Sequence, residues 1–223
     1  MAAALASSAA AAGSGLLAAN ALGGLRWTPD DLLARATEIE GHSDNAAACL
    51  NGGLVAVVPG PVAQQVPLPE GLAFIVVIPD ARTSTLEARG ALPAAVPLVD
   101  AAATLSRAVG LTLALCEERL DDLPPLLEDR LHEPHRGPMV PGIDAIRGLV
   151  DGRACLGATI SGSGPSMLLW AREESAADVA AAAEAALADA GVAARVRPSK
   201  CAPVGCRARW TGGSDLRLAR AVG

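Results

Sequence analysis

Residues 155–170, with the sequence CLGATISGSGPSMLLW, consist of two apolar runs on either side of a turn rich in glycine. An uninterrupted apolar run of this length, bounded by glycine and proline, is typical of a strand buried in a sheet. The turn at 161–166 can offer backbone N–H groups to a phosphate. It is not a Walker loop, because no Gly-Lys-Ser or Gly-Lys-Thr follows it. The stretch therefore predicts two strands joined by a candidate anion-binding loop.

Helices and strands alternate on both sides of this stretch. The expected strands are residues 52–58, 72–79 and 193–199, the last at a sheet edge. The expected helices are residues 7–22, 28–40, 84–92, 98–118, 142–153 and 175–191. Such an alternation predicts an α+β chain, that is, an α/β arrangement in two layers. Four prolines and two glutamines make residues 59–69 a surface connection and the best candidate for a domain boundary.

Local signals support the helix predictions. Thr28 is a suitable N-cap for the helix at 28–40, with Pro29 at its first position and Asp30 and Asp31 near the positive end of its dipole. The helix at 98–118 is long, and its pattern is amphipathic.

The composition excludes several classes of function. With three Trp, one Phe, no Tyr and a net charge of -6, the chain offers neither stacking platforms nor a basic surface for nucleic acid. The five cysteines are odd in number and scattered, which suits reduced thiols in the cytoplasm better than a disulfide framework.

The first charged residue is Arg26, and the stretch before it is rich in Ala, Ser and Gly. A secretory signal or transit peptide would carry basic residues, and a membrane span would be more strongly apolar. We therefore expect a helix there and no membrane partner. Ser7 and Ser8 in front of this helix suit either an ordinary N-cap or an anion site, and both interpretations stay open.

A polar block over residues 38–45 overlaps the end of the second expected helix and continues into the loop after it. It contains Glu38, Glu40, His42, Asp44 and Asn45. Carboxylates, an imidazole and an amide this close together can bind a divalent cation and orient a hydroxyl group. The alternative is a solvated turn in which Asp44 and Asn45 cap the next helix.

Taken in order, the blocks of the chain resemble the GHMP kinase superfamily and, within it, the homoserine kinases. The matching blocks are ALASSAAAA (4–12), EGHSDNAAACLNGGLV (40–55), IPDARTSTLEARGALP (78–93), DRLHEPHR (129–136) and ISGSGPS (160–166). The resemblance covers nearly the whole chain. It implies a GHMP kinase-like fold, with part of a ribosomal-S5-like, ATP-binding N-terminal domain at 1–66 and a ferredoxin-like C-terminal domain at 67–223.

The resemblance also implies an activity, the transfer of the ATP γ-phosphate to the side-chain hydroxyl of L-homoserine, with Mg²⁺. Ser8 and Glu40 would hold the metal, with Glu38 as the alternative to Glu40. The implied ATP-binding residues are Leu5, Ala6, Ser7, Ser8, Ala9, Gly162, Ser163 and Gly164.

For homoserine, the resemblance implies a site lined by His42, Asp44 and Asn45, with Asp44 and Asn45 as the catalytic candidates. No catalytic base is assigned. Arg89 and Arg136 would clamp the substrate carboxylate, since a planar guanidinium binds a carboxylate through two hydrogen bonds. Thr85 lies one helical turn before Arg89 and would sit beside the same group.

The chain departs from the family pattern at its start. Ala4 and Ala6 stand where the family has glycines, and a Cβ there can crowd a phosphate. Met1 falls inside the phosphate loop, so we expect a truncated kinase with little activity of its own. Another small-molecule GHMP kinase and a non-catalytic interaction module remain alternatives. The expected location is the cytoplasm, or a plastid if the source is a plant or alga, and a homodimer is compatible with the resemblance.

Overall fold

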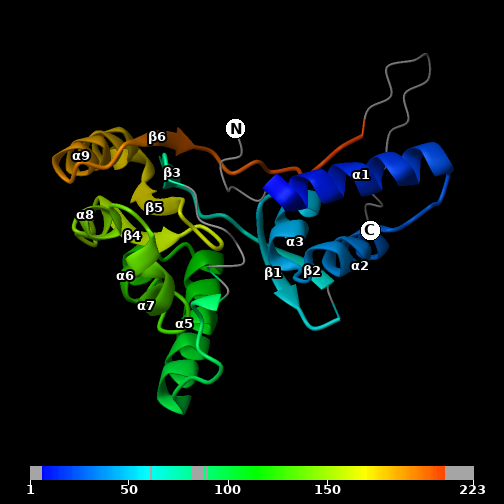
Figure 1. Cartoon of the computed structure of the whole chain (residues 1–223), viewed down its shortest axis with the longest axis horizontal. Helices are drawn as coiled ribbons and strands as arrows, with labels where there is room; N and C mark the ends of the chain where they lie inside the picture. The colour runs from blue at the N-terminus through cyan, green and yellow to red at the C-terminus, as the bar shows by residue number, and fades with distance from the viewer. Residues whose placement is uncertain (1–6, 61, 82–87, 89, 209–223) are drawn as a thin grey trace. The chain divides into compact units, whose positions relative to one another are not determined.

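A computed structural model of the chain describes residues 7–60, 62–81, 88 and 90–208 (Figure 1). These residues form two compact units. The N-terminal unit comprises residues 7–66 together with 201–208, and the C-terminal unit comprises residues 67–200. The division after Val66 comes from the packing of the chain, and the extents of the two predicted domains stay a prediction.

Three helices and a β-hairpin make up the N-terminal unit (Figure 1). The elements are α1 (Ser7–Gly23), α2 (Pro29–Glu40), α3 (Asp44–Asn51), β1 (Leu54–Val58) and β2 (Val62–Val66). The two strands pair antiparallel, with Leu54 opposite Val66. Leu33, Ala36, Ala46 and Ala47 form the buried core of this unit.

The surface connection expected at 59–69 contains a strand that was not predicted, β2. Gly60 adopts a φ of +99°, which permits a tight turn between the strands, and β1 then supplies backbone partners to Val62–Val66. The prolines that suggested a loop lie outside the strand. The hydrogen bonds of a hairpin therefore outweighed the weak strand pattern of this segment.

The start of α2 confirms the predicted cap. The Thr28 hydroxyl accepts a hydrogen bond from the Asp31 N–H at 3.2 Å, and the Asp31 carboxylate accepts one from the Thr28 N–H at 2.9 Å. This reciprocal pair is a capping box, with Pro29 at the first helical position. Gly41 ends the helix with a φ of +75°, so the chain can turn directly into the polar block.

The C-terminal unit contains a four-stranded antiparallel sheet in the order β4-β5-β3-β6. Its strands are β3 (Leu72–Pro79), β4 (Cys155–Ile160), β5 (Met167–Arg172) and β6 (Ala194–Ser199). Its α-helices are α5 (Leu98–Cys116), α6 (Leu123–Leu126), α7 (Glu133–Arg136), α8 (Ile143–Arg147) and α9 (Ala176–Asp189). With α5 and α9 as the crossover helices, the order β3-α5-β4-β5-α9-β6 is the ferredoxin-like β-α-β-β-α-β pattern.

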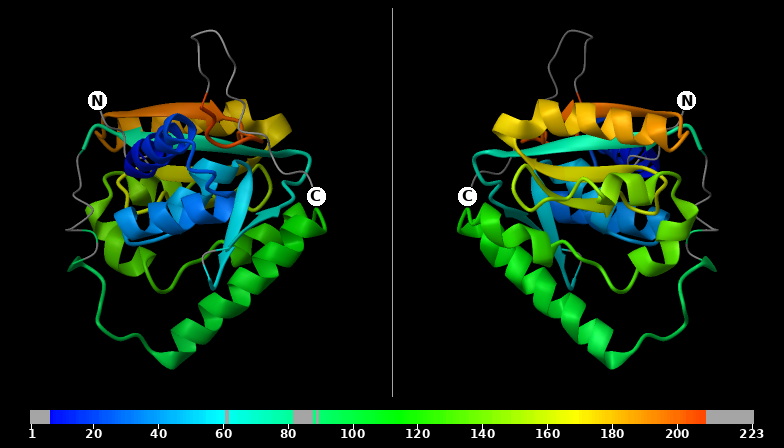
Figure 2. Two further views of the ribbon diagram at one scale, coloured as in Figure 1. Left: turned by 90° about the vertical axis from the view of Figure 1, so that its right-hand side faces the viewer. Right: turned by 90° about the vertical axis from the view of Figure 1, so that its left-hand side faces the viewer.

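The core of this unit lies between one face of the sheet and the helices α8 and α9. Ile75, Val77 and Leu169 of the sheet are buried together with Ile146 and Ala183 of the two helices. Figure 2 shows α9 running along β3 and β6, the strands on which it packs. As predicted, β6 is an edge strand.

Two predicted helices are shorter than expected. The segment at 142–153 is helical only over α8, because the Asp151 carboxylate accepts hydrogen bonds from the N–H groups of Arg153 and Cys155 and forms a turn instead. The helix predicted at 98–118 is α5, which ends two residues earlier, at Cys116. The predicted helix at 84–92 lies largely outside the described residues.

Helix α5 is less amphipathic than its pattern predicted. Ala114 and Leu115 are buried, but Leu98 and Leu105 are 83% and 68% exposed. Asp100 and Arg107 form ion pairs with Arg130 and Glu128. By length and composition alone, α5 is long and apolar enough to cross a membrane.

Candidate functional site

The N-terminal unit brings the two predicted metal ligands together. Helices α1 and α2 pack against each other so that the start of α1 meets the end of α2. The Ser8 hydroxyl in the first turn of α1 donates a hydrogen bond of 2.7 Å to the Glu40 carboxylate, 32 residues later in the chain. The acceptor of this hydrogen bond is Glu40 and not Glu38, the alternative ligand.

These two groups suit a hard cation. A hydroxyl and a carboxylate are oxygen ligands, and Mg²⁺ is usually bound by one or two carboxylates together with the phosphates of a substrate. Among the described residues, no three His, Cys, Asp or Glu side chains gather as a metal site of their own. The N–H groups of the first turn of α1 have no partner within the helix, which favours an anion there. Leu5 and Ala6 lie outside the described residues.

The polar block after α2 is organised by Asp44. Its carboxylate lies 2.6 Å from His42 Nδ1 and accepts a hydrogen bond from the Asn45 N–H at 2.8 Å. Glu40 is the last residue of α2, His42 lies in the short connection after Gly41, and Asp44 and Asn45 are in the first turn of α3. The expected capping of the next helix by Asp44 and Asn45 is wrong, because Ser43 is the N-cap of α3 and both residues lie inside the helix. The Asp44 carboxylate instead contacts the His42 imidazole and the Asn45 N–H.

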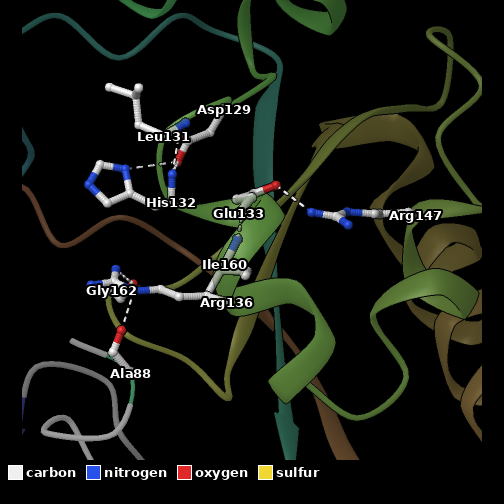
Figure 3. Close-up of polar contacts among 9 residues, drawn as sticks. All are labelled: Ala88, Asp129, Leu131, His132, Glu133, Arg136, Arg147, Ile160 and Gly162. Atoms are coloured by element: carbon white, nitrogen blue, oxygen red, sulfur yellow. Dashed lines mark hydrogen bonds and ion pairs between the residues drawn. The ribbon is translucent and has the colours of Figure 1, made fainter. Parts of the chain in front are cut away.

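The C-terminal unit gathers three of the matching blocks around Arg136, as Figure 3 shows. Arg136 ends α7, and its Nε–H donates to the carbonyl of Ala88 at 3.2 Å. Its Nη1 donates to the carbonyl of Gly162 at 3.3 Å. The carbonyls of Ala88 and Gly162 are thus the hydrogen-bond acceptors of Arg136 among the described residues. Thr85 and Arg89 lie outside the described residues.

The glycine turn that Arg136 contacts is closed by its own backbone. The Ser161 N–H donates to the carbonyl of Ser166 at 2.8 Å, and the Gly164 N–H donates to the carbonyl of Ser161 at 3.0 Å. Gly164 requires glycine, because its φ is +81° and a Cβ there would lie 3.2 Å from Val140. Gly162 has a φ of +60°. The loop therefore has a defined shape beside Arg136.

Two residues of this cluster, Glu133 and Arg147, were not predicted from the sequence. Glu133 is buried and accepts a hydrogen bond from the Ile160 N–H at 2.8 Å. Its other oxygen lies 2.7 Å from Nη2 of Arg147 (Figure 3). The only signal in the sequence was an acidic residue inside a matching block, and its partners are 27 and 14 residues away.

His132, in the matching block 129–136, contacts the carboxylate of Asp129. The Asp129 carboxylate accepts hydrogen bonds from the N–H groups of Leu131 and His132 and lies 3.0 Å from His132 Nδ1. Burial acts to raise the pKa of Asp129, but the hydrogen bonds and the nearby imidazole outweigh it, so that its pKa lies below the usual 3.8. His132 thus has a structural partner within its own connection.

Two family profiles match the chain. The one described as GHMP kinases N terminal domain matches residues 1–53, and the one described as GHMP kinases C terminal matches residues 111–189. The chain belongs to the GHMP kinase family.

Relatives in this family carry a more specific name. The homoserine kinase of Thermus thermophilus is 39% identical over 168 residues, which are 74% of this chain and 57% of the relative. The homoserine kinase of Streptomyces avermitilis is 43% identical over 184 residues, 79% of this chain and 59% of the relative. The crystal structure of homoserine kinase from Cytophaga hutchinsonii matches with a TM-score of 0.82 and 30% identity, over 90% of this chain and 66% of that one. The chain thus spans less than two thirds of the length of these GHMP kinases.

Proposed function

We propose that this GHMP kinase is a homoserine kinase, which transfers the γ-phosphate of ATP to the side-chain hydroxyl of L-homoserine and forms O-phospho-L-homoserine, a step toward threonine. The observation that carries the proposal is the hydrogen bond between Ser8 and Glu40, because it joins the two matching blocks at the groups that would hold Mg²⁺. The names of the relatives support the choice of homoserine as the acceptor.

Phosphoryl transfer needs positioning and charge neutralisation more than covalent help from the protein. Ser8 and Glu40 supply oxygen ligands, and Mg²⁺ bound there would offset the charge of the phosphates. The first turn of α1 presents N–H groups at the positive end of the helix dipole, where a triphosphate is stabilised. We assign ATP contacts to Ser7, Ser8, Ala9 and the glycine turn, with Leu5 and Ala6 expected to contribute.

The residues proposed for the acceptor are taken from the matching blocks of each unit separately. Asp44 and Asn45 are the groups proposed to lie near the reacting hydroxyl, and the contact with Asp44 orients His42. Arg136 is proposed to bind the substrate carboxylate, because a planar guanidinium can donate two parallel hydrogen bonds to it. Arg89 and Thr85 are proposed as its companions by their position in the matching block 78–93.

The test is binding and turnover with defined ligands. The purified chain is titrated with Mg-ATP and with L-homoserine by calorimetry, and homoserine-dependent ADP formation is followed in a coupled assay. We expect Glu40→Gln to weaken Mg-ATP binding about tenfold and Asn45→Ala to lower any turnover by at least about tenfold. Homoserine-dependent turnover by the chain above that of Asn45→Ala would support the proposed function.

Two outcomes would favour the alternatives. Turnover with mevalonate or shikimate in place of homoserine would indicate another GHMP kinase. The absence of both heat and a thermal shift with Mg-ATP would favour a non-catalytic interaction module. We further propose a cytoplasmic homodimer, and a mass of one chain in size-exclusion chromatography with light scattering would contradict it.

A further inference from the structure

Helix α7 carries Arg136 but is only four residues long. A helix of this length is not stable by itself, because the conformational entropy lost in forming its first turn exceeds the stabilisation from its few hydrogen bonds. Something outside the helix must therefore fix the position of the arginine. The polar contacts in Figure 3 identify Glu133, the first residue of α7, as the group that does so.

The two oxygens of the Glu133 carboxylate have different partners. Oε1 accepts the hydrogen bond from the Ile160 N–H at 2.8 Å, and Ile160 is the last residue of β4 before the glycine turn. Oε2 lies 2.7 Å from Nη2 of Arg147, the last residue of α8. The residue is only 9% exposed, so both contacts are needed to offset the cost of burying its charge.

Arg147 in turn reaches the other end of α7. A Cβ built on Gly137, the residue directly after Arg136, would lie 3.4 Å from Nη1 and 3.8 Å from Nη2 of Arg147. The guanidinium therefore lies against the backbone that follows the helix. Glu133 is attached to β4 and to Arg147, and Arg147 covers Gly137, so α7 is held at both ends.

We propose that Glu133 is a positioning residue, whose carboxylate holds α7 so that Arg136 stays in place beside the glycine turn. It acts through Arg136 and does not itself touch a ligand. The inference rests on the proposed function in one respect, since the ligand assigned to Arg136 is the carboxylate of homoserine. The contacts of Glu133 with Ile160 and Arg147 stand without that assignment.

Glu133→Gln separates the two contacts. The amide oxygen can still accept from the Ile160 N–H, but the NH₂ group then faces the Arg147 guanidinium, which is also a donor. We expect this variant to raise the dissociation constant for L-homoserine about tenfold in calorimetry, while that for Mg-ATP changes less than about twofold. Unchanged homoserine binding would overturn the proposal.

Glu128→Gln is the matched control. Glu128 forms an ion pair of 2.6 Å with Arg107 in the same unit, but its side chain is exposed and contacts neither α7 nor the glycine turn among the described residues. The same chemical change there should leave both dissociation constants unchanged. A homoserine effect in Glu128→Gln equal to that in Glu133→Gln would overturn the proposal, because loss of any carboxylate would then suffice.

A second measurement needs no ligand. In ¹⁵N spectra of the chain, Glu133→Ala should speed hydrogen exchange of the Ile160 amide at least about tenfold and shift the Arg136 Nε–H signal, which is identified by its loss in Arg136→Gln. Glu128→Gln should change neither. If the wild-type chain binds no homoserine, the proposed function is contradicted, while these two signals still decide the role of Glu133. An unmoved Arg136 signal would overturn that role even if Ile160 exchanged faster.

Discussion

At the scale of single residues, hydrogen bonds set the chemistry of several groups near the site. Asp129 is the clearest case, because one carboxylate serves the backbone N–H groups of Leu131 and His132 and the imidazole of His132. Its pKa is below 3.8 in the folded chain, although burial opposes this shift. The hydrogen bonds from the backbone favour the ionised carboxylate and tie it to the connection before α7.

Asp129 is expected to make stability depend on pH in the acid range. A pKa that is lower in the folded state contributes stability above pH 3.8, and this contribution disappears as the pH falls through the folded-state pKa. Asp129→Asn should lower the free energy of unfolding by about 1 kcal/mol at pH 7 and flatten the loss of stability below pH 4. Urea denaturation at a series of pH values measures both. The exposed Asp189→Asn serves as control, and equal effects of the two would contradict the prediction.

The thiols of Cys155 and Cys116 are expected to differ in reactivity, because Cys155 is buried and Cys116 is exposed. Burial raises the pKa of Cys155 to about 11, and the nearby Asp151 adds to this, while a hydrogen bond to Gly157 opposes it. Because the thiolate is the reactive form, Cys155 should resist iodoacetamide at pH 8 in the folded chain, while the exposed Cys116 is alkylated. Peptide mass spectrometry over a time course would show this order. Labelling of Cys155 at the rate of Cys116 under native conditions would contradict it.

At the scale of elements, the segment at 201–208 is held against the end of α3 by close backbone contacts. The Cys206 N–H donates to the carbonyl of Cys49 at 2.7 Å, and the Gly53 N–H donates to the carbonyl of Ala202 at 2.6 Å. A Cβ on Gly205 would clash with the backbone carbonyl of Leu50. Only glycine lets the two backbones approach this closely.

Gly205→Ala should therefore destabilise the N-terminal unit by more than about 2 kcal/mol, since neither backbone can give way. Gly15→Ala is the matched control within the same unit. Gly15 lies inside α1 with nothing within 4 Å of its added Cβ, so alanine should stabilise by about 0.5–1 kcal/mol through helix propensity. Chemical denaturation followed by circular dichroism measures the change in the free energy of unfolding for both variants. A Gly205→Ala chain as stable as the wild type would contradict the prediction.

At the scale of the whole molecule, the two units have separate cores of different size. Among the described residues the C-terminal unit has a cluster of thirteen buried residues, whereas the N-terminal cluster has four. Since stability scales with buried apolar area, the N-terminal unit should be the less stable. Local opening of a protein follows such differences in core size.

Differential scanning calorimetry of the chain should accordingly show two transitions, the first belonging to the N-terminal unit. Gly205→Ala should lower the first transition by several degrees and leave the second in place. Leu169→Ala, in the buried core of the C-terminal unit, should lower the second. A single transition lowered by both substitutions would show that the units unfold together.

The elements that could be predicted from the sequence are those with local causes. The cap of α2 depends on Thr28 and Asp31, which are three positions apart, and the strands β3, β4 and β5 are short apolar runs between turn residues. The strand β2 was missed because its pattern is weak without its partner β1. The exposed face of α5 was missed because periodicity shows which residues share a face but not what covers it.

The sequence by itself determined the family, the candidate residues and most of the elements, because matching blocks, capping signals and apolar runs are local in the chain. Only the tertiary structure decided which of these residues meet. It joined Ser8 to Glu40 over 32 positions and Glu133 to Ile160 over 27, and it placed Arg136 beside Gly162. Such contacts depend on how helices and strands pack, and no periodicity in the sequence records the partner of a single buried carboxylate.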